Sequence, residues 1–269
     1  MEKVSKVMLE KREDGKKDQE SLQILISTIN IETDEQVQQL VKKMNIKSDY
    51  LVVNQVKQKD EVVICNKKVI TLEKYGLSCS RNVAIKQANT EIIMLADDDV
   101  SYVENYNEII KEAYRKNPKV DMICFWIESK NKERKVKRMP SGKVGYLRVM
   151  RICSFQISMK RDNIKDIYFD ERFGSGSKYD RGEEGIFLCD CLRKGLKIKF
   201  INQKIGTVDQ KESTWYKGFP KEYFEIQGKV FKRMYPKFYV LIIIQFAIRK
   251  YHQYRKQITF KQALKAMLI

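Results

Sequence analysis

The sequence predicts an α/β fold in which a mostly parallel sheet is flanked by helices. Apolar runs of strand length alternate with helix-length segments between residues 22 and 127, and such alternation is typical of a parallel sheet covered by helices. The chain has 269 residues, of which 43% are hydrophobic, so a domain of this class can bury a substantial core. No apolar run approaches the ~20 residues that a membrane-spanning helix needs.

The first half of the chain supplies most of the expected elements. Six strands are expected, at 22–28, 50–53, 61–64, 69–72, 91–96 and 120–127. Three helices are expected between them, from Thr33 or Asp34, over 80–89 and over 102–116. A Thr or Asp side chain can cap a first helical turn, and the residue before Pro118 disfavours helix. Ligands bind at the carboxyl ends of parallel strands, so the residues after Ala96 are placed where chemistry occurs.

The second half is less regular. We expect a strand at 155–159, a glycine-rich loop at 169–177, a helix from about 184 that stops at Gly195, and a strand at 196–201. A glycine just past the last turn is a common helix terminator because it adopts the left-handed conformation.

The net charge of +18 is concentrated in two segments. Residues 226–269 carry ten Lys or Arg and no Asp or Glu, and residues 130–151 carry nine Lys or Arg with the single acid Glu133. The rest of the chain carries equal numbers of basic and acidic residues. A charge of this size predicts a polyanionic partner, which can be nucleic acid, an anionic membrane surface or a phosphorylated ligand. Because no aromatic-interleaved RNA-binding motif is present, the sequence does not favour nucleic acid.

The N-terminus and the cysteines point to a reducing compartment. Residues 1–20 are charged throughout and lack the apolar centre of a signal peptide, so we expect a loosely packed lead-in and a cytosolic chain. The six cysteines show no zinc-like spacing, and His252 is the single histidine. We expect the cysteines to be reduced and to act as small hydrophobic residues.

An acidic triplet, Asp97-Asp98-Asp99, directly follows the apolar strand at 91–96. Three adjacent carboxylates repel one another, and a bound Mg²⁺ or Mn²⁺ would relieve that repulsion with the oxygen ligands these ions prefer. The alternative is a solvated acidic turn that caps the following helix.

Five segments in order resemble family 2 glycosyltransferases with the GT-A fold. The sequence GLSCSRNVAI at 76–85, followed by 91–100, resembles the nucleotide-sugar half of that family, where an Arg-Asn pair opens a helix and a strand ends in an Asp-rich DXD metal motif. FDERFG at 169–174 and GEE at 182–184 resemble its acceptor-side stretch, and STW at 213–215 resembles an element of bacterial polysaccharide members. The resemblance covers roughly residues 22–216.

The resemblance implies a UDP-sugar donor and a divalent metal, Mn²⁺ or Mg²⁺. It makes Asp99 the metal ligand, and it places Asp97 near both the ribose and the metal. Asp98 is also assigned to the donor site. A divalent ion is suited to this position because it neutralises the diphosphate leaving group as a Lewis acid.

Four further residues are assigned to the donor. Arg81 and Asn82 lie at a helix start, where backbone N–H groups and the helix dipole favour phosphate oxygens; the alternative for Arg81 is a surface salt bridge. Thr28 and Asn54, at the ends of the first two strands, are candidate contacts to the nucleobase. Their alternative role is that of simple turn residues.

The acceptor side needs a base, because the attacking hydroxyl must lose a proton. Where the family commonly has Glu-Asp, this chain has Glu183-Glu184, so the resemblance assigns Glu184 as the base with Glu183 as the alternative. The alternative is a purely structural role, in which two acids in the first turn of a helix complement its dipole. The resemblance also assigns Asp170, Glu171 and Trp215 to the acceptor.

One departure bears on metal binding. Many relatives carry a His after the base helix, whereas this chain reads Val-Asp-Gln-Lys at 208–211. Asp209 and Gln210 are the candidates to replace it. The missing His also keeps open a second hypothesis, a non-catalytic basic adaptor with a transferase-like fold. A nucleotidyltransferase is a further alternative, because its sheet and acidic metal site look similar.

The C-terminal segment combines apolar and basic residues. Residues 238–248 are apolar except Gln245, and an apolar stripe recurs at helical spacing over 260–268. A run this short cannot span a bilayer, but its basic flanks suit an interfacial helix on an anionic leaflet. The alternative is a helix packed on the catalytic domain. The basic loop 130–151 is expected near the acceptor side, where it would attract a phosphorylated lipid.

Together these features predict a lead-in at 1–20, a GT-A catalytic domain at 21–225 and a basic membrane-associating tail at 226–269. The catalytic domain divides into a nucleotide-sugar half, 21–128, and an acceptor half, 129–225. The expected activity is inverting transfer from a UDP-sugar to a polyprenyl-diphosphate-linked glycan in the synthesis of bacterial capsule or exopolysaccharide. The expected location is cytoplasmic, peripheral on the inner face of the cell membrane.

Overall fold

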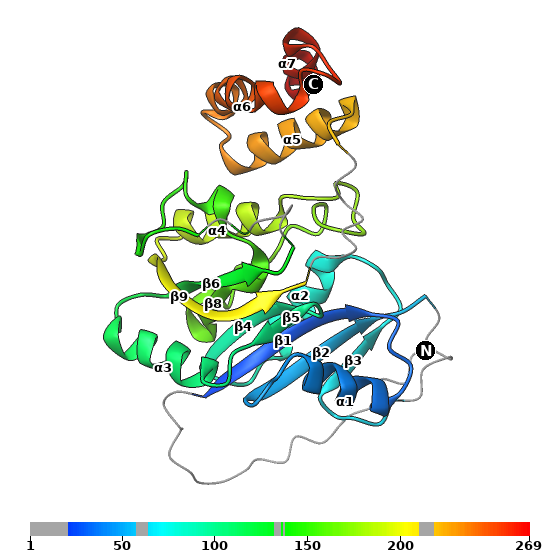
Figure 1. The fold of residues 1–269 in the computed structure, drawn as a ribbon, viewed down its shortest axis with the longest axis vertical. Helices are drawn as coiled ribbons and strands as arrows, with labels where there is room; N and C mark the ends of the chain where they lie inside the picture. Colours follow the sequence, from blue (N-terminus) through cyan, green and yellow to red (C-terminus); the bar gives the residue numbers. More distant parts are fainter. Residues whose placement is uncertain (1–20, 58–63, 132–135, 137, 210–217) are drawn as a thin grey trace, which may run out of the picture.

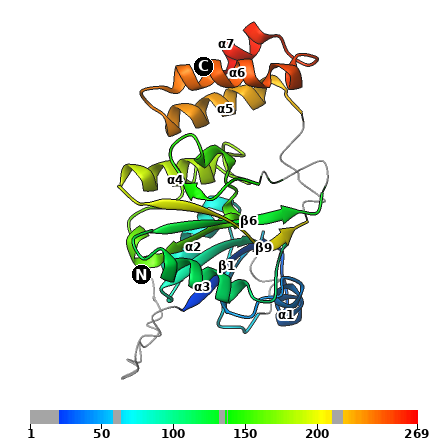
Figure 2. The same cartoon turned by 60° about the vertical axis from the view of Figure 1, so that its left-hand side comes forward.

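The computed structural model describes residues 21–57, 64–131, 136, 138–209 and 218–269. A layered α/β domain occupies most of the molecule, and three C-terminal helices stack at one end of it, beyond helix α4 (Figure 1). The same succession of sheet, α4 and C-terminal helices is visible in the view turned by 60° (Figure 2). The predicted α/β class, with a helical C-terminal segment, is confirmed.

The first half of the sheet is parallel, as expected. Its four neighbouring strands, in spatial order, are β3 (Val69–Leu72), β2 (Asp49–Gln55), β1 (Leu22–Ile29) and β4 (Ile92–Asp97). Two helices cover it, α1 (Asp34–Lys43) and α2 (Leu77–Gln87). Thr33 caps α1 through a reciprocal capping box with Gln36, which confirms the first of the two start residues considered.

The second half makes the sheet mixed rather than mostly parallel. The remaining strands are β5 (Val100–Tyr102), β6 (Met122–Ser129), β7 (Gly142–Lys143), β8 (Ile157–Lys160) and β9 (Ile198–Val208). β8 lies antiparallel between β4 and β6, β9 is parallel to β6, and β5 and β7 are antiparallel to β9. β8 can reverse because the long segment after β6 brings the chain back without a crossover helix.

Two helices belong to this half, α3 (Tyr106–Lys116) and α4 (Glu183–Arg193). The helix expected over 102–116 therefore begins later, because Val100 and Tyr102 are buried in β5 and pair with β9. The strand expected at 155–159 starts at Ile157, after a short 3₁₀ turn. Of the strand expected at 61–64, all but Ile64 lies outside the described residues, and Ile64 is in irregular structure.

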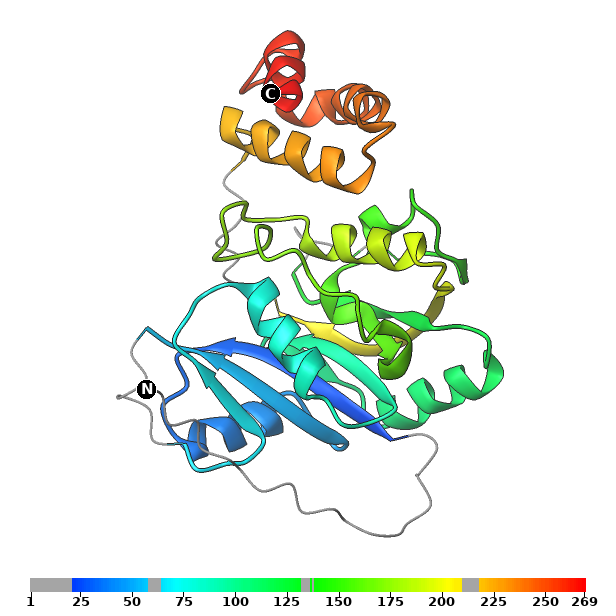
Figure 3. The same cartoon turned by 180° about the vertical axis from the view of Figure 1, so that it is seen from behind.

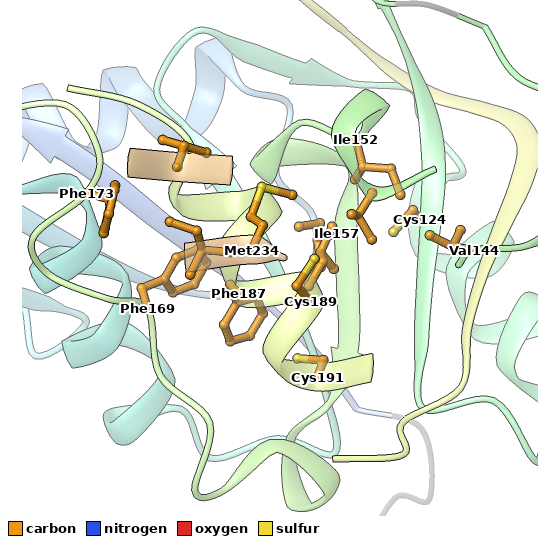
Figure 4. Close-up of a cluster of buried hydrophobic side chains, with 14 of the residues drawn as sticks. Cys124, Val144, Ile152, Ile157, Phe169, Phe173, Phe187, Cys189, Cys191 and Met234 are labelled. Atoms are coloured by element: carbon orange, nitrogen blue, oxygen red, sulfur yellow. The ribbon is translucent and has the colours of Figure 1, made fainter. Parts of the chain in front are cut away.

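Two hydrophobic clusters cover the two faces of the sheet. One contains Leu25 with residues of α2, α4 and the C-terminal helices, and part of it is shown in Figure 4. The other contains Ile24 and Ile26 with residues of α1 and α3. Because β1 is buried on both faces, its sequence is a continuous apolar run rather than an alternating one.

The C-terminal helices are α5 (Lys221–Met234), α6 (Tyr239–Tyr254) and α7 (Phe260–Leu268). The boundary expected between 225 and 226 falls inside α5. α5 and α7 pack so closely that a Cβ on Gly228 would collide with the backbone of Met267. Each helix also buries residues in the same hydrophobic cluster as α4, so the segment packs on the domain. No helix in the described part of the chain is long and apolar enough to cross a bilayer.

Candidate active site

The acidic triplet lies at the carboxyl end of β4, beside the end of β1. β4 runs beside β1, with Asp97 in register with Ser27, so Asp97 ends its strand at the carboxyl edge of the sheet. The chain then turns through Asp98 and Asp99 into β5. The Thr28 hydroxyl donates to Asp98 Oδ2 at 2.7 Å. Thr28 thus lies beside the triplet.

Asp99 is the least satisfied of the three carboxylates. Its Oδ1 is buried and has no hydrogen-bond partner. Burial, followed by the charges of Asp97 and Asp98, raises the pKa of Asp99 to about 7. Asp97 and Asp98, by contrast, both accept side-chain hydrogen bonds.

The donor set fits a hard divalent cation that shares its ligands with a substrate. Within the described ranges, no three His, Cys, Asp or Glu side chains converge on one metal position. Mg²⁺ is usually held by one or two carboxylates together with substrate phosphates and water, so Asp99 and Asp97 suffice as protein ligands. The orphaned buried oxygen of Asp99 is the atom that such an ion would satisfy.

Asp209 lies next to the triplet. Its backbone N–H donates to the carbonyl oxygen of Asp99 at 3.0 Å, directly after Val208 pairs with Val100. The end of β9 therefore brings Asp209 to the position from which a side chain could complete the donor site. The other candidate to replace the missing His, Gln210, lies outside the described residues.

Arg81 connects the donor side to the acceptor side. One of its terminal nitrogens donates to Asp97 Oδ1 at 2.9 Å and the other to Glu183 Oε1 at 3.0 Å. The Ser154 hydroxyl is a further partner at 2.6 Å. The guanidinium is only 2% exposed. Arg81 is therefore a buried ion-pair residue rather than the surface salt bridge considered above, and both terminal nitrogens are engaged by protein groups.

The pair Glu183-Glu184 forms the first turn of α4. Gly182 precedes it with φ of +87°, and a Cβ there would collide with Val230 of α5; glycine is therefore required for the chain to enter the helix at this angle. Glu183 pairs with Arg81, whereas Glu184 forms no ion pair with a Lys or Arg of the described residues. Burial, together with the neighbouring Glu183 charge, raises the pKa of Glu184 well above the usual carboxyl range.

Two asparagines expected to contact the donor instead bind backbone. Asn82 accepts from the Phe169 N–H at 2.7 Å and donates to the Phe169 carbonyl at 3.0 Å. Asn54 does the same with Ile31, at 3.0 and 2.7 Å. Both side chains are buried. Asn82 thus fixes the acceptor-side stretch to α2, and Asn54 fixes the loop after β1.

The acceptor candidates have different surroundings. Asp170 is held by Arg172 and by Arg233 of α5, and these arginines lower its pKa to about 2. Glu171 is 47% exposed and accepts from Lys74 and Asn82, so it remains accessible to a ligand. Trp215 lies outside the described residues.

Two residues of the network were not identified from the sequence. Ser154 donates to Asp97 as well as receiving the Arg81 contact, and Arg233 ties α5 to both Asp170 and Asp190. Neither belongs to a recognisable motif. They are revealed only by the folded arrangement, in which residues about 60 positions apart become neighbours.

Comparison with known proteins agrees with this geometry. Residues 52–182 match the family model described as glycosyl transferase family 2. This segment contains Arg81, the acidic triplet and the acceptor-side stretch up to Gly182. No curated protein matches the sequence.

Solved structures with similar folds include complexes with nucleotide sugars. The S. aureus TarS fragment 1–349 in complex with UDP-GlcNAc superposes with a TM-score of 0.60 at 16% identity, over 91% of this chain and 79% of that one. The longer TarS structure superposes with a TM-score of 0.57 at 16% identity, over 90% of this chain and 46% of that one. The Pyrobaculum calidifontis mannosyltransferase PcManGT, in complex with GDP-Man and Mn²⁺, superposes with a TM-score of 0.50 at 10% identity. The superposition covers 92% of this chain and 73% of that one.

At these identities the structural similarity shows the fold alone, and the family model covers just under half of the chain. The chain thus has a GT-A-like fold, and its residues 52–182 match the model of family 2 glycosyltransferases.

Proposed function

We propose that this protein is a metal-dependent, inverting glycosyltransferase that moves a sugar from a UDP-sugar to a lipid-linked glycan acceptor in bacterial surface polysaccharide synthesis. The observation that carries the proposal is the pairing of Arg81 with both Asp97 and Glu183. One buried cation joins the two acidic clusters, so a donor at the triplet and an acceptor at the start of α4 would be close to each other.

The roles follow from what each carboxylate contacts. Asp99 and Asp97 would hold Mn²⁺ or Mg²⁺, and when bound that ion neutralises the leaving diphosphate. Glu184, which forms no ion pair in the described residues, takes the proton from the acceptor hydroxyl as that oxygen attacks the anomeric carbon. Glu183 is already paired with Arg81 and holds the guanidinium in place. A single in-line displacement of this kind inverts the anomeric configuration.

UDP is the proposed nucleotide because the structures with the higher TM-scores include complexes with UDP-GlcNAc and with UDP. Mn²⁺ is supported by the PcManGT complex, which contains this ion. Thr28 is the remaining candidate for the nucleotide side, since its hydroxyl lies beside Asp98. Asn54 stays a proposed donor contact, and its amide is paired with the Ile31 backbone in this structure.

A lipid-linked acceptor is supported by charge. The basic segments 130–151 and 226–269 would attract a diphosphate-linked substrate to the cytoplasmic face of the membrane. Glu171 and Asp170 lie on the acceptor-side stretch, and the more exposed Glu171 would orient acceptor hydroxyls. Trp215 remains a proposed acceptor contact.

The decisive test is ligand binding by wild type and Asp99→Asn. UDP with Mn²⁺ should raise the melting temperature of wild type by several degrees, and this rise should disappear in Asp99→Asn. Asp166→Asn is the matched control, because Asp166 is exposed and distant from the triplet in sequence. Transfer from a panel of UDP-sugars to a synthetic polyprenyl-diphosphate acceptor, read by product mass, would then identify the donor.

Other outcomes would point to the other hypotheses. If no nucleotide shifts the melting temperature of wild type, the non-catalytic adaptor is favoured. If a nucleoside triphosphate is consumed with release of diphosphate, the protein is a nucleotidyltransferase. Transfer by Asp99→Asn at the wild-type rate would exclude the assigned metal ligand.

A further inference from the structure

The outer face of α6 carries large apolar side chains that nothing in the described structure covers. Phe238, just before the helix, is 62% exposed, and Leu241 and Ile248 are 64% and 61% exposed. Ile244 and Tyr251 continue the row at helical spacing. The opposite face, with Ile243 and Phe246, is buried against the domain. α6 is thus apolar on both sides, and only one side has a partner.

A second exposed apolar site comes from the basic loop. Tyr146 and Leu147 are 43% and 64% exposed, although Val144 and Val149 on either side of them are buried in the core. The loop is therefore anchored at both ends, and its tip is held outward.

The two apolar sites adjoin. The Tyr235 hydroxyl, at the end of α5, donates to the Tyr146 carbonyl at 2.6 Å, and the Phe238 N–H bonds to the Tyr235 carbonyl at 2.9 Å. Viewed from behind, this loop rises from the level of α4 toward the end of α5 and the start of α6 (Figure 3). The loop tip and the α6 face are thus brought together by the fold, although they lie about 90 residues apart.

The charges on the two segments that carry these residues have one sign. Lys143, Arg151, Lys237, Arg249 and Arg255 are exposed. No acidic residue occurs between 138 and 151 or between 226 and 269. The two basic segments of the sequence therefore meet at one end of the molecule, around a set of uncovered apolar side chains.

We propose that Tyr146, Leu147, Phe238, Leu241, Ile244, Ile248 and Tyr251, with the surrounding Lys and Arg, form one docking surface for an anionic membrane leaflet. Apolar side chains surrounded by cations match the boundary between acyl chains and anionic headgroups. A protein partner would need its own acidic rim, whereas a leaflet supplies negative charge everywhere. The inference rests on the proposed function, because a membrane-borne acceptor is what makes this location useful.

The docking surface is rigidly connected to the acceptor side. Arg233 of α5 donates to Asp170, which follows the Phe169 backbone held by Asn82. Docking through α6 and the loop would therefore set the orientation of the acceptor stretch relative to the membrane.

The test is co-sedimentation of the full chain with vesicles of phosphatidylcholine alone or mixed with phosphatidylglycerol. Wild type should bind the mixed vesicles and not the neutral ones. Leu241→Ser combined with Ile248→Ser should weaken binding at least tenfold, and so should Leu147→Ser alone. Ile29→Ser is the matched control, because Ile29 is 53% exposed but belongs to β1, and it should bind as wild type does.

Three results would overturn the proposal: no vesicle binding by wild type, equal binding to neutral vesicles, or unchanged binding by the Leu147 and α6 variants. A concentration-dependent dimer in sedimentation equilibrium, broken by the same substitutions, would instead assign the surface to a second copy of the chain.

Failure here is distinguishable from failure of the proposed function. The α6 variant should keep the thermal shift with UDP and Mn²⁺, and Asp99→Asn should keep vesicle binding. Loss of the thermal shift in the wild type with intact vesicle binding would reject the activity and leave the docking surface standing.

Discussion

The two acidic clusters of the site resemble each other in one respect and differ in another. In each, Arg81 neutralises one carboxylate, Asp97 on the donor side and Glu183 on the acceptor side. In each, a further carboxylate, Asp99 or Glu184, forms no ion pair with a Lys or Arg of the described residues, and burial raises its pKa. The difference lies in the neighbours: three acids crowd the donor edge, whereas the acceptor pair stands at a helix N-terminus. Of the carboxylates proposed to act in the reaction, Asp99 and Glu184 form no ion pair in the described residues, whereas Asp97 is paired with Arg81.

The largest effect should come from Arg81→Met, which removes the cation shared by both clusters. Breaking a buried ion pair by deleting one partner costs about 3–5 kcal/mol, so urea unfolding should show a loss of this order together with loss of transfer. Ser154→Ala removes a neutral partner of the same guanidinium and should cost only about 1 kcal/mol. Near-native stability of Arg81→Met would show that the two clusters are independent.

The next largest effect should come from the substitutions that distinguish the role of Glu184 from that of Glu183. Glu184→Gln should lower kcat by about 10²–10⁴-fold, the usual contribution of a general base, with unchanged donor binding in the thermal shift. Glu183→Gln should mainly lower stability, because it weakens a charged hydrogen bond to Arg81. Steady-state kinetics with both variants decides between them: if Glu183→Gln loses turnover and Glu184→Gln does not, the assignment of the base is reversed.

The pH dependence of transfer should reflect the raised pKa of Glu184. The base works only when ionised, so kcat/KM should fall about tenfold per pH unit below that pKa and level off above it. For stability the sign is opposite. The stability that protonated Glu184 contributes to the folded state is complete below the ordinary carboxyl pKa, and it is lost as pH rises through the raised pKa. Melting temperatures across pH should show this loss in wild type but not in Glu184→Gln.

The smallest effect should come from the two structural asparagines. Asn82→Ala leaves the Phe169 backbone groups without their partner, and Asn54→Ala does the same at Ile31, so each should lower the unfolding free energy by about 1–3 kcal/mol. The KM for the acceptor should rise in Asn82→Ala alone, because only Asn82 holds the acceptor-side stretch. Equal KM values in the two variants would contradict that role.

How far the sequence predicts this molecule differs between its two halves. The parallel strands are apparent as continuous apolar runs, and the motifs at their ends indicate Arg81, the triplet and the Glu183-Glu184 pair. The antiparallel strands are short, and β5 has three residues. Long-range pairing therefore determines them rather than local pattern, with β9 for β5 and β7 and with β4 and β6 for β8. Side-chain partners are also invisible in the sequence: Asn54 and Asn82 have the type and position of ligand-binding residues, yet both bind backbone.

The close approach of α5 and α7 has a practical consequence for deletion experiments. Gly228 lies against the backbone of Met267, and Phe224 and Phe231 of α5 share a core with Phe246 and Ala263. Shortening the chain at about residue 236 would expose these aromatic rings to water and produce an aggregation-prone protein. A truncated protein found in a pellet would then report insolubility rather than lipid binding, so the question of membrane attachment has to be put to the intact chain, one exposed side chain at a time.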